Sequence, residues 1–112
     1  MNNIRVIVVD DSFLMRRIIS DMLNEADGIT VVAAAKDGNE LLYLLGKEKI
    51  DVITLDVEMP GMNGIEVLKV LKERKINTPV IVLSGLSKDS TELTLGSLEE
   101  GAFDFIPKPS GE

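Results

Sequence analysis

Short apolar runs rich in valine and isoleucine recur along the chain, and they constrain its fold more than any other feature. They occupy residues 4–9, 29–35, 52–55, 80–83 and 102–106. Because the runs are short, continuous and β-branched, they predict strands that are buried on both faces of a sheet. Between them, leucine, isoleucine, valine and methionine recur at the spacing of amphipathic helices. The alternation predicts an α/β fold, with a doubly wound parallel sheet and helices on both of its faces.

Two of the predicted helices begin with a capping pattern. Asp37 lies three residues before Glu40, and Asn63 lies three residues before Glu66. The fourth helix, over residues 90–100, contains threonine, glycine and serine in its interior, so we expect it to be the least stable. Its packing is expected to depend on three leucines, Leu93, Leu95 and Leu98.

The length of 112 residues suits a single domain over residues 1–112. A sheet wound in this way needs a further helix after its fifth strand, because one flank otherwise exposes apolar surface. Too few residues follow that strand to form a helix, because only Pro109 to Glu112 remain after Lys108. The fifth helix is therefore expected to be absent from this chain, which we interpret as a fragment of a longer two-domain protein.

The composition excludes several classes of function. A net charge of −7 argues against broad attraction to nucleic acid or to anionic lipid. No apolar stretch approaches the length that crosses a bilayer, so we expect a cytoplasmic protein without membrane insertion. The chain has no cysteine and no histidine, which removes disulfides, thiolate metal sites and a Ser-His-Asp triad. Any chemistry must use carboxylates, hydroxyls, amines or a bound hard metal.

Reactive polar residues stand at the ends of four of the apolar runs. Asp10 and Asp11 follow the first run, Asp56 the third, Ser84 the fourth and, one proline later, Lys108 the fifth. In an open parallel sheet all of these endings meet at the carboxyl edge, where such sheets bind ligands. Each residue alone is more often a cap, a turn residue or a solvated charge. Their joint occurrence, with complementary charges, predicts a site.

The three carboxylates indicate the chemistry of that site. Clustered carboxylates raise one another's pKa unless a cation lies among them, and oxygen ligands favour Mg²⁺. An aspartate beside the metal can attack phosphorus and form an acyl phosphate. Asp56 is the best nucleophile because it ends the strand expected at the centre of the sheet, while Asp10 and Asp11 remain possible. Lys108 would neutralise phosphoryl oxygens, and the Ser84 hydroxyl would donate a hydrogen bond.

The same segments carry a family resemblance. The sequences VIVVDDS (6–12), LDVEMPGMNG (55–64), VLSG (82–85) and DFIPKP (104–109) closely resemble the receiver domains of two-component response regulators. The resemblance covers essentially the whole chain. It implies a flavodoxin-like, CheY-like sheet with the strand order 2-1-3-4-5, an order for which the chemotaxis receiver is a standard example.

In such receivers the aspartate that matches Asp56 accepts a phosphoryl group from the phosphohistidine of a partner histidine kinase. The resemblance implies a Mg²⁺ (or Mn²⁺) site in which Asp11 and Asp56 bind through their side chains. Asp10 would bind mainly through a bridging water, and Glu58 through its backbone carbonyl.

The resemblance also assigns roles near the end of the chain. Ser84 and Lys108 match the hydroxyl and the lysine that contact the phosphoryl group. Phe105 matches an aromatic switch that turns inward when the hydroxyl moves, although a strand phenylalanine can equally be a core residue. The bond from Lys108 to Pro109 matches a cis peptide, a form that only proline makes inexpensive.

Finer features resemble one subfamily. The segments DSFLMRR (11–17) and TLGSLEEGAFDFIPKPSG (94–111), and especially KPSG (108–111), are similar to the receivers of chemotaxis protein-glutamate methylesterases. That resemblance implies a chemotaxis histidine kinase as phosphodonor, chemoreceptors as partners of the parent protein, and a carboxyl-terminal esterase restrained until Asp56 is phosphorylated. The chain itself, lacking histidine, cannot supply the esterase triad.

Three alternatives stay open. The receiver could stand alone, or it could control a DNA-binding domain. An aspartyl phosphatase would share much of the site, but that class carries a second aspartate two residues after its nucleophile, where this chain has Glu58. A nucleotide-binding loop is disfavoured because Asp10 and Asp11 would repel phosphate where glycines are needed.

Overall fold

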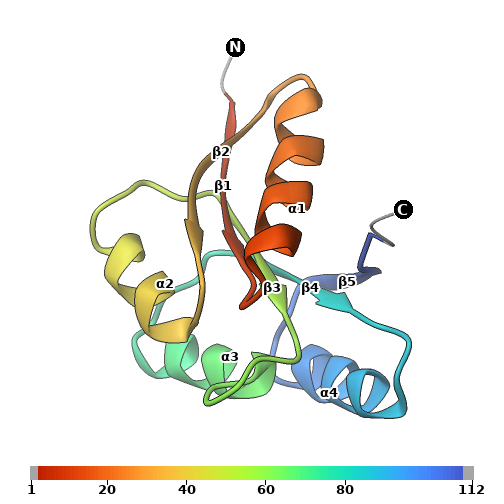
Figure 1. Ribbon diagram of the computed structural model, residues 1–112. Helices are drawn as coiled ribbons and strands as arrows, with labels where there is room; N and C mark the ends of the chain where they lie inside the picture. Colours follow the sequence, from red (N-terminus) through yellow and green to blue (C-terminus); the bar gives the residue numbers. More distant parts are fainter. Residues whose placement is uncertain (1–2, 110–112) are drawn as a thin grey trace.

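The computed structural model describes residues 3–109, which form a five-stranded parallel sheet and four helices (Figure 1). The strand order is β2-β1-β3-β4-β5, as the resemblance implied, and the fold is that of the flavodoxin-like receivers. Along the chain the elements are β1 (Ile4–Val9), α1 (Phe13–Glu25), β2 (Ile29–Ala35), α2 (Gly38–Leu45), β3 (Val52–Asp56), α3 (Gly64–Glu73), β4 (Val80–Ser84), α4 (Lys88–Glu99) and β5 (Asp104–Pro107).

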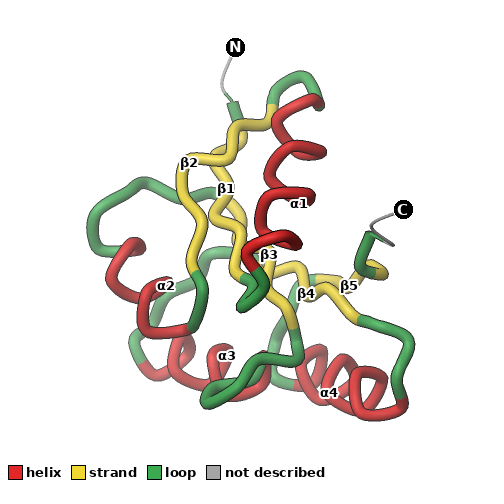
Figure 2. Tube along the Cα trace, in the orientation of Figure 1, coloured by secondary structure: helices red, strands yellow, loops and turns green. Residues whose placement is uncertain are grey.

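The helices cover the two faces of the sheet unequally. One face carries α1, whose Ile19 packs against Val6, Val8 and Leu83. The opposite face carries α2, α3 and α4, which lie together on one side in Figures 1 and 2. The larger core lies beneath these helices and includes the fully buried Ile53 and Leu55 of β3. Among residues 3–109, no helix combines the length and the apolar character that crossing a membrane requires.

The capping patterns form as the sequence predicts, one of them completely. At α3 the Asn63 side chain accepts from the Glu66 N–H at 3.1 Å, and the Glu66 carboxylate accepts from the Asn63 N–H at 3.1 Å. At α2 the Asp37 side chain accepts from the Glu40 N–H at 2.8 Å. The Glu40 carboxylate, however, accepts from the N–H of Lys36, one residue before the cap.

The fourth helix packs differently from the sequence prediction. It is capped by Ser87 and begins two residues earlier than the predicted range 90–100. Leu95, expected to pack inward, is 58% exposed, so the leucine prediction is wrong at that position. Leu93 and Leu98 are partly buried against the core. The buried side chains of α4 are instead those with hydroxyls, on Ser90, Thr94 and Ser97.

Close packing between α3 and α4 accounts for the small side chain at Ser97. A Cβ on Gly64 would lie 3.2 Å from the Ser97 Oγ and 3.1 Å from the Cα of Val57. A Cβ on Gly96 would lie 2.5 Å from the Cδ1 of Ile65. These separations are shorter than ordinary van der Waals contact, so the interface between α3 and α4 leaves no room for a side chain at Gly64 or Gly96.

The fifth strand departs from the expectation of burial on both faces. β5 covers Asp104–Pro107, slightly later than the predicted range 102–106, and all four of its residues are exposed. It is an edge strand, and within residues 3–109 no helix covers it on the side of α1. An apolar groove of about 180 Å³ lies there, lined by Ile19, Met22, Leu23, Thr54, Leu83, Ile106, Pro107 and Pro109. The buried Thr54 hydroxyl in this groove has no hydrogen-bond partner within the described part of the chain.

Candidate functional site

Three aspartates meet at the carboxyl edge of the sheet. Asp10 follows β1 and Asp56 ends β3, and these strands are neighbours, with Val9 paired to Leu55. One carboxylate oxygen each from Asp10, Asp11 and Asp56 lie within 4.8 Å of one another. Asp10 and Asp56 are buried, at 0% and 1% exposure, whereas Asp11 is exposed. The cluster therefore opens to solvent on the side of Asp11.

The two buried carboxylates are held in the same way. The Oδ1 of Asp10 accepts from the N–H of Ser12 at 2.9 Å, and the Oδ1 of Asp56 accepts from the N–H of Glu58 at 3.0 Å. Such bonds to the backbone two residues on are typical of aspartates in turns. They leave each Oδ2 without a hydrogen-bond donor in the described chain, apart from the ammonium of Lys108. Two buried acceptors are thus available for a ligand.

Lys108 supplies the positive charge of the site. Its Nζ lies 3.0 Å from the Oδ2 of Asp56 and 3.7 Å from the Oδ2 of Asp10. The backbone fixes this approach, because the Lys108 N–H donates to the Ser84 carbonyl at 2.9 Å where β5 leaves the sheet beside β4. With three aspartates and one lysine, the site carries a formal charge of −2 when all four groups are ionised.

Burial shifts the proton affinity of these groups. It raises the pKa of Asp56 from 3.8 to about 6, although the hydrogen bonds from Glu58 and Lys108 act in the opposite direction. Burial also raises the pKa of Asp10 above its ordinary value, against the hydrogen bond from Ser12. For Lys108, burial lowers the pKa, but the hydrogen bond and charge of Asp56 and the charges of Asp10 and Asp11 outweigh it and raise the pKa overall. The buried carboxylates therefore gain most from a nearby cation.

The donor set fits a hard divalent cation. All three side chains offer carboxylate oxygens, and two of these oxygens are buried acceptors without a backbone donor. Mg²⁺ prefers oxygen ligands of this kind and keeps several waters, for which the exposed side at Asp11 leaves access. The Glu58 backbone carbonyl, the fourth predicted ligand, belongs to the residue whose N–H already binds Asp56.

Two predicted residues remain, Ser84 and Phe105, and the structure places them differently. Ser84 ends β4 next to the site, because its strand neighbour Leu83 is paired with Asp56. Phe105 pairs with Val82 in the sheet, but it is 46% exposed, so the interpretation of this ring as a core residue is wrong. Its role as a switch stays a prediction.

The prediction of a cis peptide bond before Pro109 is wrong. Every peptide bond of the described chain is trans, including that from Lys108 to Pro109. The trans form of a bond before proline is favoured by only about 0.5–1 kcal/mol, so packing decides the isomer and the sequence alone does not. Ser110 and Gly111, the last part of the KPSG segment, lie outside the described residues.

Sequence reasoning missed several residues that support the site. Arg16 donates to the backbone carbonyl of Asp10 at 2.8 Å, and its guanidinium lies 5.8 Å from the ring centroid of Phe13. Ser87 donates to the Glu58 carboxylate at 3.2 Å. Neither contact can be predicted from the sequence. An arginine on a helix is usually a solvated charge, and a serine before a helix is usually only its cap.

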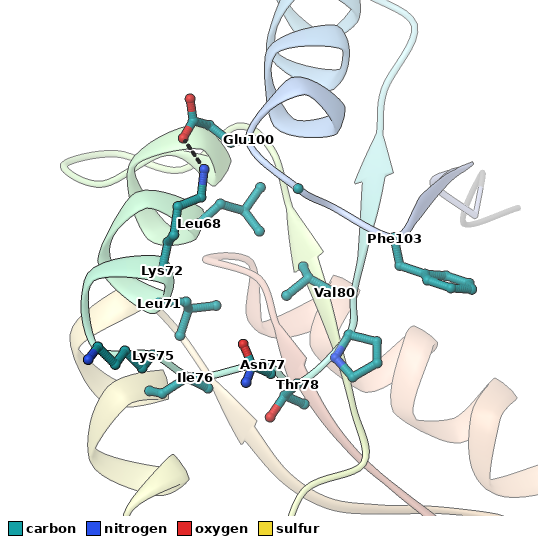
Figure 3. A pocket seen from close by; sticks show the side chains of 12 residues that line it. Leu68, Leu71, Lys72, Lys75, Ile76, Asn77, Thr78, Val80, Glu100 and Phe103 are labelled. Atoms are coloured by element: carbon teal, nitrogen blue, oxygen red, sulfur yellow. Dashed lines mark hydrogen bonds and ion pairs between the residues drawn. The ribbon is translucent and has the colours of Figure 1, made fainter.

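A hollow of about 570 Å³ lies away from this site, between α3 and the amino end of β4 (Figure 3). Lys72 and Glu100 form an ion pair of 3.1 Å across its rim. Leu68 and Leu71 of α3 form part of its wall (Figure 3). β4 lines the hollow through Val80, at the amino end of the strand. The length of β4 therefore separates the hollow from the carboxyl edge of the sheet.

Comparison with known proteins gives consistent matches. Residues 6–112 match the model of the response regulator receiver domain. The chain is 56% identical over 109 residues to a protein-glutamate methylesterase/protein-glutamine glutaminase of Clostridium acetobutylicum, covering 97% of this chain and 32% of the relative. The corresponding Bacillus subtilis protein is 52% identical over 108 residues, covering 96% and 30%. The chain thus spans about a third of the length of these relatives.

Solved structures agree with the sequence matches. The response regulator domain of Thermotoga maritima CheB superposes with a TM-score of 0.84 at 44% identity, covering 98% of this chain and 81% of that chain. The receiver domain of the Francisella response regulator 1452 superposes with a TM-score of 0.80 at 40% identity, covering 96% and 85%. By sequence, by fold and by the residues at the carboxyl edge of its sheet, the chain belongs to the response regulator receiver domain family.

Proposed function

We propose that the chain accepts a phosphoryl group on Asp56 from the phosphohistidine of a chemotaxis histidine kinase. The observation that carries this proposal is the ion pair between the buried Asp56 Oδ2 and the Lys108 ammonium, 3.0 Å apart, beside two further carboxylates. A buried carboxylate with one oxygen fixed by the backbone and the other aimed at a cation is arranged to react at that second oxygen.

Different residues of this chain carry out different parts of the phosphoryl transfer. The Asp56 Oδ2 attacks phosphorus, the bond from phosphorus to the imidazole nitrogen breaks, and the departing histidine keeps the electron pair and takes a proton. With a pKa of about 6, Asp56 is mostly ionised at neutral pH and available as the nucleophile. Lys108 then balances charge on the phosphoryl oxygens, and Ser84 donates a hydrogen bond to them.

A divalent metal fits this scheme as cofactor. Asp11 and Asp56 would hold Mg²⁺ or Mn²⁺ through their side chains, Asp10 through a water and Glu58 through its carbonyl. The bound ion would supply charge neutralisation for the carboxylates and for the incoming phosphoryl oxygens. Loss of Asp10 should therefore weaken metal binding, so that phosphorylation requires a higher concentration of Mg²⁺.

The parent protein extends the proposal. Because the relatives are about three times longer and carry the names of methylesterases, we assign this chain to the regulatory part of such a protein. Phosphorylation of Asp56 would release a carboxyl-terminal esterase domain that acts on chemoreceptors in the cytoplasm, without nucleic acid or membrane insertion. The groove between α1 and β5, with its apolar lining, would be covered by a further helix of the longer protein.

The decisive experiment is incubation with a small phosphodonor and Mg²⁺, followed by intact mass measurement. The chain should gain one phosphoryl group, Asp56→Asn should gain none, and Asp10→Asn should require more Mg²⁺. Modification that persists in Asp56→Asn would mean that another residue is the nucleophile. Turnover of a phosphomonoester without a labelled protein would favour an aspartyl phosphatase instead.

A further inference from the structure

Glu58 connects one loop of the site to another. Its backbone N–H donates to the Asp56 carboxylate at 3.0 Å, which fixes the start of the connection after β3. Its carboxylate accepts from the Ser87 hydroxyl at 3.2 Å, in the connection between β4 and α4. On the way it passes Gly85, where an added Cβ would lie 3.9 Å from the Glu58 Oε1. One residue therefore links the reactive aspartate to the loop that follows Ser84.

Ser87 and Ser90 together attach this loop to α4. The Ser87 Oγ accepts from the Ser90 N–H at 3.0 Å and so caps the helix. The buried Ser90 Oγ accepts from the Gly85 N–H at 2.7 Å. Because residues 85–87 are the whole connection between β4 and α4, only two residues separate Ser84 from the group to which Glu58 is bonded, and a shift of the Ser84 backbone is passed on over a short distance.

We propose that Ser87 is a positioning residue for the reaction at Asp56: its hydrogen bond to Glu58 holds residues 85–87 and the start of α4 in the unphosphorylated position. This inference rests on the proposed function. A shift of the Ser84 backbone towards the phosphoryl group would draw the short connection of residues 85–87 with it and would strain the bond to Glu58.

The electrostatics act in the same direction. A phosphoryl group on Asp56 adds negative charge two residues from the Glu58 carboxylate, which favours movement of Glu58 away from its present place. Both Glu58 and Ser87 are exposed, and an exposed bond to a charged group contributes little free energy. The bond is therefore weak enough to break when the site is phosphorylated, and its removal should change the population of the loop position only a few-fold.

Three substitutions at Ser87 separate this role from helix capping. Ser87→Gly removes the hydroxyl donor and costs a cap only a few tenths of a kcal/mol. Ser87→Asp keeps a good cap but faces Glu58 with a like charge. Ser87→Asn keeps the cap and retains an N–H donor for Glu58, so it serves as the matched control.

Two measurements on the whole 112-residue chain test the proposal. Amide hydrogen exchange without a phosphodonor should be about two- to fivefold faster across residues 85–91 in Ser87→Gly and Ser87→Asp. With Mg²⁺ and a small phosphodonor, both variants should be phosphorylated about two- to fivefold faster, because the competent loop position is more populated. Ser87→Asn should match the original chain in both measurements.

The outcomes separate this proposal from the proposed function. Unchanged exchange in Ser87→Gly and Ser87→Asp would overturn the positioning role, since the bond would then restrain nothing. Faster exchange with an unchanged rate of labelling at Asp56 would overturn the coupling and leave the proposed function standing. No labelling of any variant, the original chain included, would overturn the proposed function and the coupling with it.

Discussion

Two successive strand-loop-helix units contribute Asp56 and Ser84 to the site, and their helices are packed in different ways. β3 ends on Asp56 and leads through residues 57–63 to α3, whereas β4 ends on Ser84 and leads through residues 85–87 to α4. The buried face of α3 is apolar, with Val67, Leu68 and Leu71 at 1–5% exposure. The most deeply buried side chains of α4 are those of Ser90, Thr94 and Ser97, at 0–5% exposure, while Leu93 and Leu98 are only partly buried against the core.

The difference indicates which part of the site can move. Each buried leucine or valine stabilises α3 by about 1.5–3 kcal/mol. In α4, Thr94 donates to the Ser90 carbonyl at 2.8 Å and Ser97 to the Leu93 carbonyl at 2.7 Å, so these hydroxyls are satisfied within their own helix. Such bonds move with the helix and do not fix it to the sheet. We therefore expect the unit with the proposed nucleophile to be the more rigid of the two, and the unit with the proposed phosphoryl sensor to be held more weakly.

The largest expected difference between the units comes from leucine truncation. Leu71→Ala in α3 should lower the free energy of unfolding by about 2–5 kcal/mol, because Leu71 is 3% exposed and its removal leaves a cavity. Leu95→Ala in α4 should cost less than about 0.5 kcal/mol, because Leu95 is 58% exposed. Urea denaturation at neutral pH measures both. Equal losses would contradict the contrast between the helices.

The next effect is the pH dependence contributed by Asp56. The folded state raises its pKa from 3.8 to about 6, so it binds the proton more tightly than the unfolded chain does. The resulting stability is fully present below about pH 4 and is lost as pH rises through about 6, with a change of about 3 kcal/mol. The raised pKa of Asp10 acts in the same direction.

Urea unfolding from pH 4 to 8 in a metal chelator measures this dependence. Asp56→Asn should flatten the pH profile and be more stable than the original chain at pH 7, whereas Ser84→Ala should keep the original slope. A profile that rises between pH 4 and 7 only when Asp56 is present would show that the ion pair with Lys108 outweighs burial.

Tight packing between the two units predicts a smaller effect. Gly64→Ala should destabilise by about 1–3 kcal/mol, because the new Cβ would lie 3.1 Å from the Val57 backbone, which cannot move aside. Gly96→Ala should cost less, since its closest contact is the terminal methyl of Ile65, which can rotate, and since alanine favours the helix. Thermal unfolding of the two variants ranks them, and the reverse order would mean that the α3–α4 interface adjusts at Gly64 rather than at Gly96.

The smallest expected effect concerns the start of α3. Asn63→Ala removes one half of the reciprocal capping box and should cost about 1 kcal/mol. Asn63→Asp, which keeps an oxygen acceptor for the Glu66 N–H, is the matched control and should stay within about 0.5 kcal/mol of the original chain. Guanidinium denaturation distinguishes them; similar losses in both variants would mean that position 63 acts through more than its cap.

The sequence predicted the site better than it predicted the packing around it. Asp10, Asp11, Asp56 and Lys108 come together as expected, because strand ends in a parallel sheet share one edge whatever the details of packing. The prediction that Leu95 packs on the inward face of α4 was wrong. Hydrophobicity alone cannot show that two helices approach so closely that leucine no longer fits between them.

The sequence by itself determined the strand positions, the strand endings that carry the reactive residues, and the family. These are local features, set by short continuous runs of β-branched apolar residues and by the residues at their ends. Only the tertiary structure decided that Lys108 approaches Asp56 to 3.0 Å, that the bond before Pro109 is trans, and that Glu58 bonds to Ser87. Each of these depends on contacts between segments far apart in the chain, or on free-energy differences near 1 kcal/mol that packing easily overrides.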